Sequence, residues 1–210
     1  MQREMYQKRK LEIALSKLRP HPSPKAYLEQ YTIPPNLAAE ILYLAAYTYG
    51  DIVGKTVSDL GCGTGRLGIG AAILGAKEVI GVDLDVAAVK EAQHNASILR
   101  VHKVTSWIVA DIDILRGTFD TVVQNPPFGV QRRTADRRFL QKALEVGEVV
   151  YSLHKSGMPN REFIKSLVRK FEGNVDGIFQ MKLVIPPTFN FHRKRKYQVN
   201  VDLYRIVKRK

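Results

Sequence analysis

The sequence is poor in cysteine, since Cys62 is the only one among its 210 residues. A single thiol allows neither an intrachain disulfide nor an all-cysteine zinc site. Long apolar stretches are missing as well, because the longest one, residues 37–47, contains Glu40 and is too short to span a bilayer. The basic N-terminus leads into no apolar segment of the kind found in secretory signals. These absences predict an intracellular, cytoplasmic protein.

Acidic residues are also scarce. The chain has 20 Asp and Glu against 33 Lys and Arg, which gives a formal net charge of +13. This surplus favours a polyanionic partner such as nucleic acid, although a basic or heat-adapted surface would have the same sign of charge. Hydrophobic residues make up 45% of the chain, so it can bury the core of one domain of ordinary size.

The spacing of apolar residues divides the chain into an N-terminal part, residues 1–35, and a main domain, residues 36–210. Residues 3–19 have the spacing of an amphipathic helix, and a proline-rich connector follows them. A second helix begins at the prolines 34 and 35 and is expected to continue to Gly50. Beyond it, short apolar runs alternate with helical patterns. Strands are expected at 56–60, 78–82, 104–110, 121–124, 149–153, 177–185 and 199–207, and helices at 66–74, 86–99, 135–146 and 159–171.

This alternation predicts an α/β fold with a doubly wound, mostly parallel seven-stranded sheet of the Rossmann-like kind. Parallel strands that alternate with helices are joined by right-handed crossovers, which place helices on both faces of the sheet. The last two strands follow one another with no helix between them, so they are expected to form an antiparallel hairpin at the C-terminal edge.

A glycine-rich turn follows the first expected strand. Residues 57–68 have the sequence V-S-D-L-G-C-G-T-G-R-L-G. Gly61, Gly63 and Gly65 allow a sharp turn and let a ligand approach the backbone amides. About twenty residues further on, Asp83 ends the second strand, where a carboxylate can accept both hydroxyls of a ribose. The two features together predict a ligand that contains a nucleoside.

The spacing of these glycines favours a methyl donor over a dinucleotide. A dinucleotide fingerprint has the form G-x-G-x-x-G, whereas this turn has the form G-x-G-x-G with Asp59 two residues before it. A carboxylate at that position would repel a pyrophosphate and attract the ammonium group of S-adenosylmethionine. We therefore expect S-adenosylmethionine as the cofactor, with a dinucleotide and a purely structural turn as the alternatives.

The fourth expected strand ends in N-P-P-F-G, residues 125–129. The two prolines fix their own φ angles, so Asn125, Pro126, Pro127 and Phe128 form a rigid exit beside the glycine turn. There the Asn125 side-chain carbonyl and a neighbouring backbone carbonyl can accept hydrogen bonds from a planar amine, while Phe128 offers a stacking face. These four residues are the expected catalytic residues, and the alternative is a turn that only ends the strand.

Six stretches of the chain are similar to motifs of one known family. They are L-E-Q-Y at 28–31, D-L-G-C-G at 59–63, N-P-P-F-G at 125–129, V-Y-S-L-H-K-S at 150–156, F-H-R-K-R-K at 191–196 and V-D-L-Y-R at 201–205. Together they resemble the methyltransferase-like protein 5 family over almost the whole chain. Its members are class I enzymes that methylate adenine N6 in small-subunit ribosomal RNA of archaea and eukaryotes. The glycine turn and N-P-P-F occur throughout the superfamily, whereas Y-S-L-H-K-S and the F-H-basic run are far more specific.

The resemblance implies a set of contacts with the cofactor. Gln30 would fold over it, and Asp111 and Ile112 would flank its adenine. A threonine of the family aligns with Ile33, so that contact would pass through the backbone or shift to Thr32. The expected cofactor-binding residues are Gln30, Ile33, Asp59, Gly61, Thr64, Arg66, Asp83, Asp111 and Ile112.

The family also implies a protein partner, a small zinc-ribbon activator that pairs with the edge strand of the sheet. The third expected strand, residues 104–110, lies at an edge and has the apolar sequence V-T-S-W-I-V-A. An uncovered edge of this kind promotes aggregation. We expect a heterodimer through this strand, and the alternative is that another part of the same chain covers it.

Basic residues lie near the expected active site. Two groups of them are on loops at the strand ends, where they can neutralise RNA phosphates, and the alternative is a solvated charged face. His154 and Lys155 are expected either to contact RNA or to have a structural role only. The expected RNA-binding residues are Arg132, Arg133, Arg137, Arg138, His154, Lys155, His192, Arg193, Lys194, Arg195 and Lys196. No residues have the spacing of a metal site.

These observations predict an enzyme that transfers a methyl group from S-adenosylmethionine to N6 of one adenine in small-subunit ribosomal RNA. The target base would be unpaired or flipped out, because in a duplex its N6 faces the partner base. Guanine N2 in RNA and a protein glutamine amide are the alternative acceptors. A non-catalytic RNA-binding assembly factor is the alternative from another class. Such a factor would be expected to have lost the glycine turn or Asn125, and this sequence has both.

Overall fold

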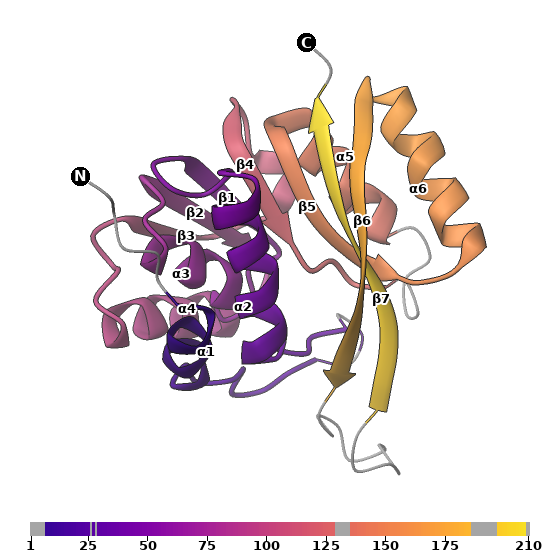
Figure 1. The fold of residues 1–210 in the computed structure, drawn as a ribbon. Helices are drawn as coiled ribbons and strands as arrows, with labels where there is room; N and C mark the ends of the chain where they lie inside the picture. Colours follow the sequence, from indigo (N-terminus) through magenta and orange to yellow (C-terminus); the bar gives the residue numbers. More distant parts are fainter. Residues whose placement is uncertain (1–6, 26, 28, 129–134, 186–196, 209–210) are drawn as a thin grey trace.

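Helices and strands alternate along most of the chain (Figure 1). The computed structural model describes residues 7–25, 27, 29–128, 135–185 and 197–208. The elements in order are α1 (Lys8–Ser16), α2 (Pro35–Tyr43), the π-helical turn η2 (Leu44–Thr48), β1 (Thr56–Leu60), α3 (Arg66–Ile73), β2 (Glu78–Asp83), α4 (Val86–Ile98), β3 (Thr105–Val109), the 3₁₀ turn η3 (Ile112–Ile114), β4 (Phe119–Gln124), α5 (Ala135–Val146), β5 (Gly147–Lys155), α6 (Met158–Lys170), β6 (Gly173–Ile185) and β7 (Tyr197–Lys208).

Seven strands form one sheet in the order β3-β2-β1-β4-β5-β7-β6. The strands β1 to β5 are parallel to one another, whereas β7 lies antiparallel between β5 and β6. From β1 the chain first adds β2 and β3 on one side and then β4 and β5 on the other. The predicted doubly wound sheet with a C-terminal antiparallel hairpin is therefore confirmed. Its switch point, where folds of this kind bind ligands, lies between β1 and β4.

The register of the central strands determines which residues meet at this switch point. Leu60, the last residue of β1, pairs with Val82 of β2 and with Gln124 of β4. Because the three strands are parallel, the next residues, Gly61, Asp83 and Asn125, reach the same edge of the sheet at the same level. The glycine turn, the expected ribose-binding carboxylate and the N-P-P-F motif are thus brought together by strand pairing.

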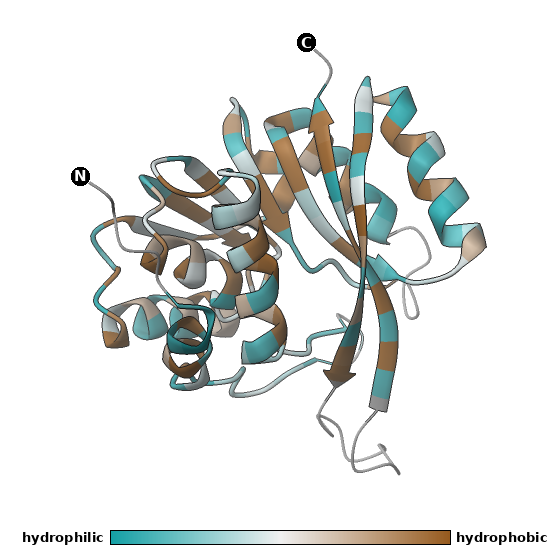
Figure 2. Ribbon diagram, viewed as in Figure 1, coloured by the Kyte–Doolittle hydropathy of each residue, from teal (hydrophilic) through white to brown (hydrophobic). Residues whose placement is uncertain are grey.

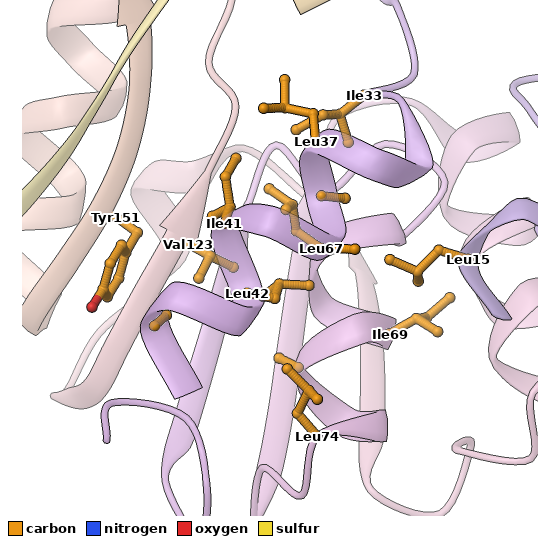
Figure 3. Close-up of a cluster of buried hydrophobic side chains, with 14 of the residues drawn as sticks. Leu15, Ile33, Leu37, Ile41, Leu42, Leu67, Ile69, Leu74, Val123 and Tyr151 are labelled. Carbon is orange, nitrogen blue, oxygen red and sulfur yellow. The ribbon is translucent and has the colours of Figure 1, made fainter. Parts of the chain in front are cut away.

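Hydrophobic side chains cover both faces of the sheet. Figure 3 shows part of one cluster, in which Leu15 of α1 and Ile69 of α3 lie close together beside the sheet. A second cluster includes Leu140 of α5 and packs α5 and α6 against the other face. Val122 belongs to the second cluster and Val123 to the first, since consecutive side chains of a strand point to opposite faces. The apolar and polar bands that alternate along the first half of β7 in Figure 2 reflect the same period.

Two helices differ from their expected bounds by more than one residue. α1 ends at Ser16 rather than at residue 19, and residues 3–6 of the expected helix lie outside the described residues. Its amphipathic pattern is confirmed, because Leu11 and Leu15 are both 0% exposed, and burial of each contributes about 1.5–3 kcal/mol. α2 ends at Tyr43 and continues as the π-helical turn to Thr48 instead of as an α-helix to residue 50. Within the described ranges, no helix is both long and apolar enough to cross a membrane.

Several strands are longer than their sequence patterns predicted. β6 begins at Gly173, four residues before the expected start, because pairing with β7 continues past an irregularity between Val175 and Gly177. β5 begins at Gly147, directly after α5. Its first residue pairs with Phe119 of β4. Cross-strand pairing, rather than local apolar alternation, thus sets these ends.

Trp107 of β3 lies in a slot formed by three glycines. A Cβ added at Gly81 of β2 would lie 2.3 Å from Trp107 Cε3. Added Cβ atoms at Gly65 and Gly68, at the start of α3, would lie 2.8 Å and 3.0 Å from Trp107 Cη2. The indole thus occupies space that glycine leaves empty, and Gly81 is needed for packing rather than for a turn.

We therefore expect Gly81→Ala to destabilise the protein, although alanine normally suits a strand better than glycine does. The free energy of unfolding should fall by about 1–3 kcal/mol, the usual cost of overpacking. Urea denaturation measures this change. In a Trp107→Leu background the same substitution should cost less than half as much, and an equal cost in both backgrounds would contradict the packing explanation.

Candidate active site

A cavity of about 360 Å³ lies at the carboxyl ends of the central strands. Its walls come from the glycine turn, the ends of β2 and β4, the start of η3, and the connector, by which we mean residues 17–34 between α1 and α2. All nine residues that were predicted to bind the cofactor line it, namely Gln30, Ile33, Asp59, Gly61, Thr64, Arg66, Asp83, Asp111 and Ile112. Of the four predicted catalytic residues, Asn125 and Pro127 line this cavity.

The glycine turn has a backbone that depends on glycine. Gly61, Gly63 and Gly65 have φ angles of +66°, +52° and +82°, which side chains with a Cβ rarely adopt. Asp59 lies just before the turn at 1% exposure, and its Oδ2 accepts a hydrogen bond of 2.8 Å from the Gly68 amide. Desolvation by burial raises the pKa of Asp59 to about 7. A cation placed beside this carboxylate would favour its ionised form.

Asp83 holds the glycine turn in place. Its two carboxylate oxygens accept hydrogen bonds of 2.9 Å from the backbone amides of Gly63 and Asp85. Burial nevertheless raises the pKa of Asp83, because desolvation outweighs these two bonds. The end of β2 and the turn after β1 are therefore fixed to one another by this side chain.

Asp85 binds the connector to the body of the domain. It caps the N-terminus of α4 by accepting from the Ala87 amide at 3.0 Å, and its other oxygen accepts from Gln30 Nε2 at 2.9 Å. Lys25 Nζ and His21 Nε2 lie 3.1 Å and 3.3 Å from the same oxygen. Although desolvation opposes ionisation, the hydrogen bonds from Gln30 and Lys25 lower the pKa of Asp85 to about 2. The ionised carboxylate thus holds Gln30 and Lys25 of the connector against the start of α4.

The connector also contacts the N-P-P-F motif. The Tyr31 hydroxyl donates to Asn125 Oδ1 at 3.3 Å, and the Tyr31 ring lies 5.7 Å from the Phe128 ring, centroid to centroid. Glu29 accepts a hydrogen bond of 2.8 Å from the Phe128 amide. The sequence predicted a role for Gln30 of the L-E-Q-Y motif, but none for Glu29, Tyr31 or Asp85. Only Asp85 has a local signal, since an Asp directly before a helical pattern indicates a cap.

Arg66 and Thr64 of the glycine turn differ in whether their side chains form hydrogen bonds. Arg66 donates to the carbonyl oxygens of Ile33 at 2.6 Å and Leu18 at 3.3 Å, so its guanidinium fastens the connector to α3. Burial lowers the pKa of Arg66 to about 10. Thr64 is 4% exposed, and its Oγ1 is buried without a hydrogen-bond partner among the described residues.

The predicted RNA-binding residues that the structure describes lie in different environments. Arg138 forms ion pairs with Asp111 and with Asp113, the latter at 2.6 Å, so its charge is matched within the chain. The Arg137 guanidinium lies 4.8 Å from the centre of the Phe163 ring, and Lys155 is exposed at the end of β5. Arg132, Arg133, His192, Arg193, Lys194, Arg195 and Lys196 lie outside the described residues.

His154 is not at the surface, which corrects the expectation that it contacts RNA. It is 3% exposed, and its Nε2 lies 2.6 Å from Ser152 Oγ. Ser152 in turn accepts from Gln124 Nε2 at 2.8 Å, while the His154 ring lies edge-on to Tyr204. Desolvation lowers the pKa of His154 to about 4, against the attraction of Asp202. The structural role, one of the two left open by the sequence, fits this environment.

The depressed pKa of His154 predicts a dependence of stability on pH. An unfolded histidine has a pKa near 6.5, so between about pH 6.5 and pH 4 the unfolded chain binds more protons than the folded chain. The stabilisation from a neutral His154 should therefore be complete above pH 6.5 and should fall by roughly 2 kcal/mol by pH 5. Denaturant titrations at several pH values measure it.

A His154→Gln variant should lose this part of the pH dependence, because glutamine does not titrate. His102→Gln, at an exposed position on the loop before β3, is the matched control and should behave as the wild type does. If the free energy of unfolding of wild type and His154→Gln changes with pH in the same way, the buried imidazole is not the source of the pH dependence.

Comparison with known proteins places this site in a family. The family model described as ribosomal protein L11 methyltransferase (PrmA) matches residues 42–126. The protein MJ0284 of Methanocaldococcus jannaschii is 41% identical, and the match covers 97% of this chain and 95% of that protein. A crystal structure of PH1948 from Pyrococcus horikoshii has a TM-score of 0.89 at 44% identity, covering 97% of this chain and 98% of that one.

The rRNA N(6)-adenosine-methyltransferase METTL5 of Danio rerio is 33% identical, over 94% of this chain and 97% of that protein. A likeness of this extent takes in the N-terminal helix, the connector, the whole sheet and the C-terminal hairpin. This chain therefore belongs to the METTL5 family of methyltransferases.

Proposed function

We propose that the protein transfers a methyl group from S-adenosylmethionine to N6 of one adenine in small-subunit ribosomal RNA. The proposal rests on one observation above the others, namely that Asn125 of N-P-P-F and the glycine turn line the same cavity. Membership of the METTL5 family supports ribosomal RNA as the substrate and adenine N6 as the acceptor. The surplus of basic residues, a net charge of +13, suits a polyanion.

The residues present fit S-adenosylmethionine. The Thr64 hydroxyl is a buried polar atom that makes no hydrogen bond within the described part of the chain, and it lines the cavity beside the glycine turn. An unpaired polar group of this kind costs free energy unless a ligand completes it. Asp59 offers a carboxylate to an ammonium group, and Asp83 lies where a ribose would be bound. When bound, S-adenosylmethionine supplies an electrophilic methyl group on a sulfonium centre.

The other lining residues would complete the binding of the donor. Gln30 and Ile33 of the connector would cover it, Gly61 and Arg66 would hold it at the turn, and Asp111 and Ile112 would contact its adenine. Ile112, at 4% exposure, can pack against an aromatic ring. The ion pair with Arg138 limits the mobility of Asp111.

Asn125 would prepare the acceptor amine for attack. The lone pair of an adenine N6 amine is delocalised into the ring, so the amine is a poor nucleophile. Hydrogen bonds from its two hydrogens to the Asn125 carbonyl and to a neighbouring backbone carbonyl return electron density to nitrogen and orient it. Phe128, held at its amide by Glu29, would stack on the base. The proton leaves after methyl transfer, so a buried neutral His154 is not required as a base.

Ribosomal RNA would be bound by basic residues around the mouth of the cavity. Arg137 in the first turn of α5 and Lys155 at the carboxyl end of β5 are exposed. The predicted contacts on residues 132–133 and 192–196 belong to the segments that follow N-P-P-F-G and join β6 to β7 in the sequence. Arg138 is the weakest of the candidates, because it is already paired with two aspartates.

The function is tested by methylation of unmodified small-subunit ribosomal RNA with labelled donor, followed by digestion to nucleosides. Label should appear in N6-methyladenosine. Asn125→Ala should keep the affinity for the donor and lose about 10²-fold or more in kcat, as is typical when one group that stabilises a transition state is removed. Asn174→Ala, at an exposed position of β6, is the control and should match the wild type. Label in N2-methylguanosine or in a protein fraction would refute the adenine assignment.

We also propose that a small zinc-ribbon activator protein adds a strand to β3. β3 is the first strand of the sheet order, and among the described residues it pairs only with β2. Large apolar side chains are exposed on and near it, with exposed fractions of 37% for Ile108, 46% for Val109 and 51% for Val86. An apolar strand edge of this kind suits a partner that supplies both main-chain hydrogen bonds and apolar contacts.

Ile108→Lys should weaken association with such a partner at least tenfold, because it places a charge among the exposed apolar side chains of this edge. Ile98→Lys, at 39% exposure on α4, is the matched control and should not weaken the association. Affinity measured by titration of a purified zinc-ribbon partner separates the two variants. Equal affinities for both variants, or no association of the wild type, would contradict this assignment.

A further inference from the structure

Tyr31 is the connector residue that reaches the catalytic motif. Its hydroxyl donates to Asn125 Oδ1 across 3.3 Å, although 94 residues separate the two in the sequence. Its ring lies tilted by 41° against the Phe128 ring, with 5.7 Å between centroids. Burial raises the pKa of Tyr31, so the hydroxyl stays protonated and available as a donor at any physiological pH.

The direction of this hydrogen bond matters because an asparagine side chain has two chemically different ends. The carbonyl oxygen accepts two hydrogen bonds, whereas the NH₂ group can only donate. An adenine amine needs an acceptor, so Asn125 is useful only with its oxygen towards the site. A hydroxyl donor at this oxygen fixes which end of the amide lies there and leaves the second lone pair for the amine.

The backbone around Tyr31 is held on both sides. Glu29 accepts from the Phe128 amide at 2.8 Å, and Gln30 donates to Asp85 at 2.9 Å on the other side of the cavity. Ile33 is 5% exposed, and its carbonyl accepts from Arg66 at 2.6 Å. Tyr31 is therefore placed by contacts that do not involve its own hydroxyl. The distance of 3.3 Å is long for a bond between two oxygens, and such bonds commonly shorten once substrate is bound.

We propose that Tyr31 is a positioning residue that holds the Asn125 carbonyl towards the amine to be methylated. The inference rests on the proposed function, because it assumes that Asn125 accepts from that amine. Tyr31 itself need not touch the amine. Its contribution passes through the orientation of the Asn125 side chain, while its ring supports Phe128 from the connector side.

The test is Tyr31→Phe, which removes the hydroxyl and keeps the ring. A lost hydrogen bond between neutral groups corresponds to about a 3- to 10-fold effect, so kcat on ribosomal RNA should fall by that factor. KM for S-adenosylmethionine and the melting temperature should stay as in the wild type, because the contacts of Glu29, Gln30 and Ile33 remain. Tyr43→Phe, on α2 and away from the cavity, controls for a general effect of losing a phenol.

A double-mutant cycle with Asn125→Asp distinguishes orientation from packing. A carboxylate has two equivalent oxygens, so an Asp at position 125 needs no donor to select its accepting end. Tyr31→Phe should then lower kcat less than twofold in the Asn125→Asp background. An equal fall in both backgrounds, or an unchanged kcat of Tyr31→Phe in the wild-type background, would overturn the inference.

The wild-type reaction, run in parallel, separates this inference from the proposed function. If the wild type forms no N6-methyladenosine, the proposed function fails. If it forms N6-methyladenosine and Tyr31→Phe is as fast, only the role of Tyr31 fails.

Discussion

The parallel register of β1 with its two neighbours is the constraint on which the site depends. Leu60 pairs with Val82 on one side and Gln124 on the other, so Gly61, Asp83 and Asn125 leave the sheet at one level. A shift of one residue in either pairing would turn the emerging side chains to opposite faces and separate them. Main-chain hydrogen bonds thus set the distance between donor and acceptor regions before any side chain contributes. The two prolines after Asn125 then make the segment that leaves the strand rigid.

The connector forms the other half of the site, and electrostatics holds it there. The ionised carboxylate of Asp85 at the start of α4 attracts Lys25 and accepts a hydrogen bond from Gln30, and the helix N-terminus favours its negative charge. Through Glu29 and Tyr31 the same segment contacts N-P-P-F. Three consecutive residues therefore link the region around the expected ribose site with the region around the expected acceptor. Donor binding and the geometry of the acceptor site are expected to depend on each other for this reason.

Much of the fold and of the cavity was predictable because the signals are local. Apolar period and turn residues define the strands, and the glycine turn and N-P-P-F specify backbone shapes that few other sequences adopt. The contact of Tyr31 with Asn125 was not predictable, since it joins residues 94 positions apart through an irregular segment. The RNA contact considered for His154 fails for a different reason. The expected strand stopped at residue 153, but β5 continues to Lys155 and pairs His154 with Asp202 of β7, where its ring lies buried against Tyr204. Arg138 looked like a phosphate contact because its aspartate partners lie 25 and 27 residues away.

The central claim is that Asn125 accepts a hydrogen bond from an adenine amine at the same cavity that binds the methyl donor. A crystal structure with S-adenosylhomocysteine and adenosine bound tests it most directly. We predict that adenosine N6 lies about 2.9 Å from Asn125 Oδ1, with the base stacked on Phe128 and the donor product against the glycine turn. An adenosine whose N6 points away from Asn125, or a donor product bound away from Asp59 and Asp83, would contradict the account.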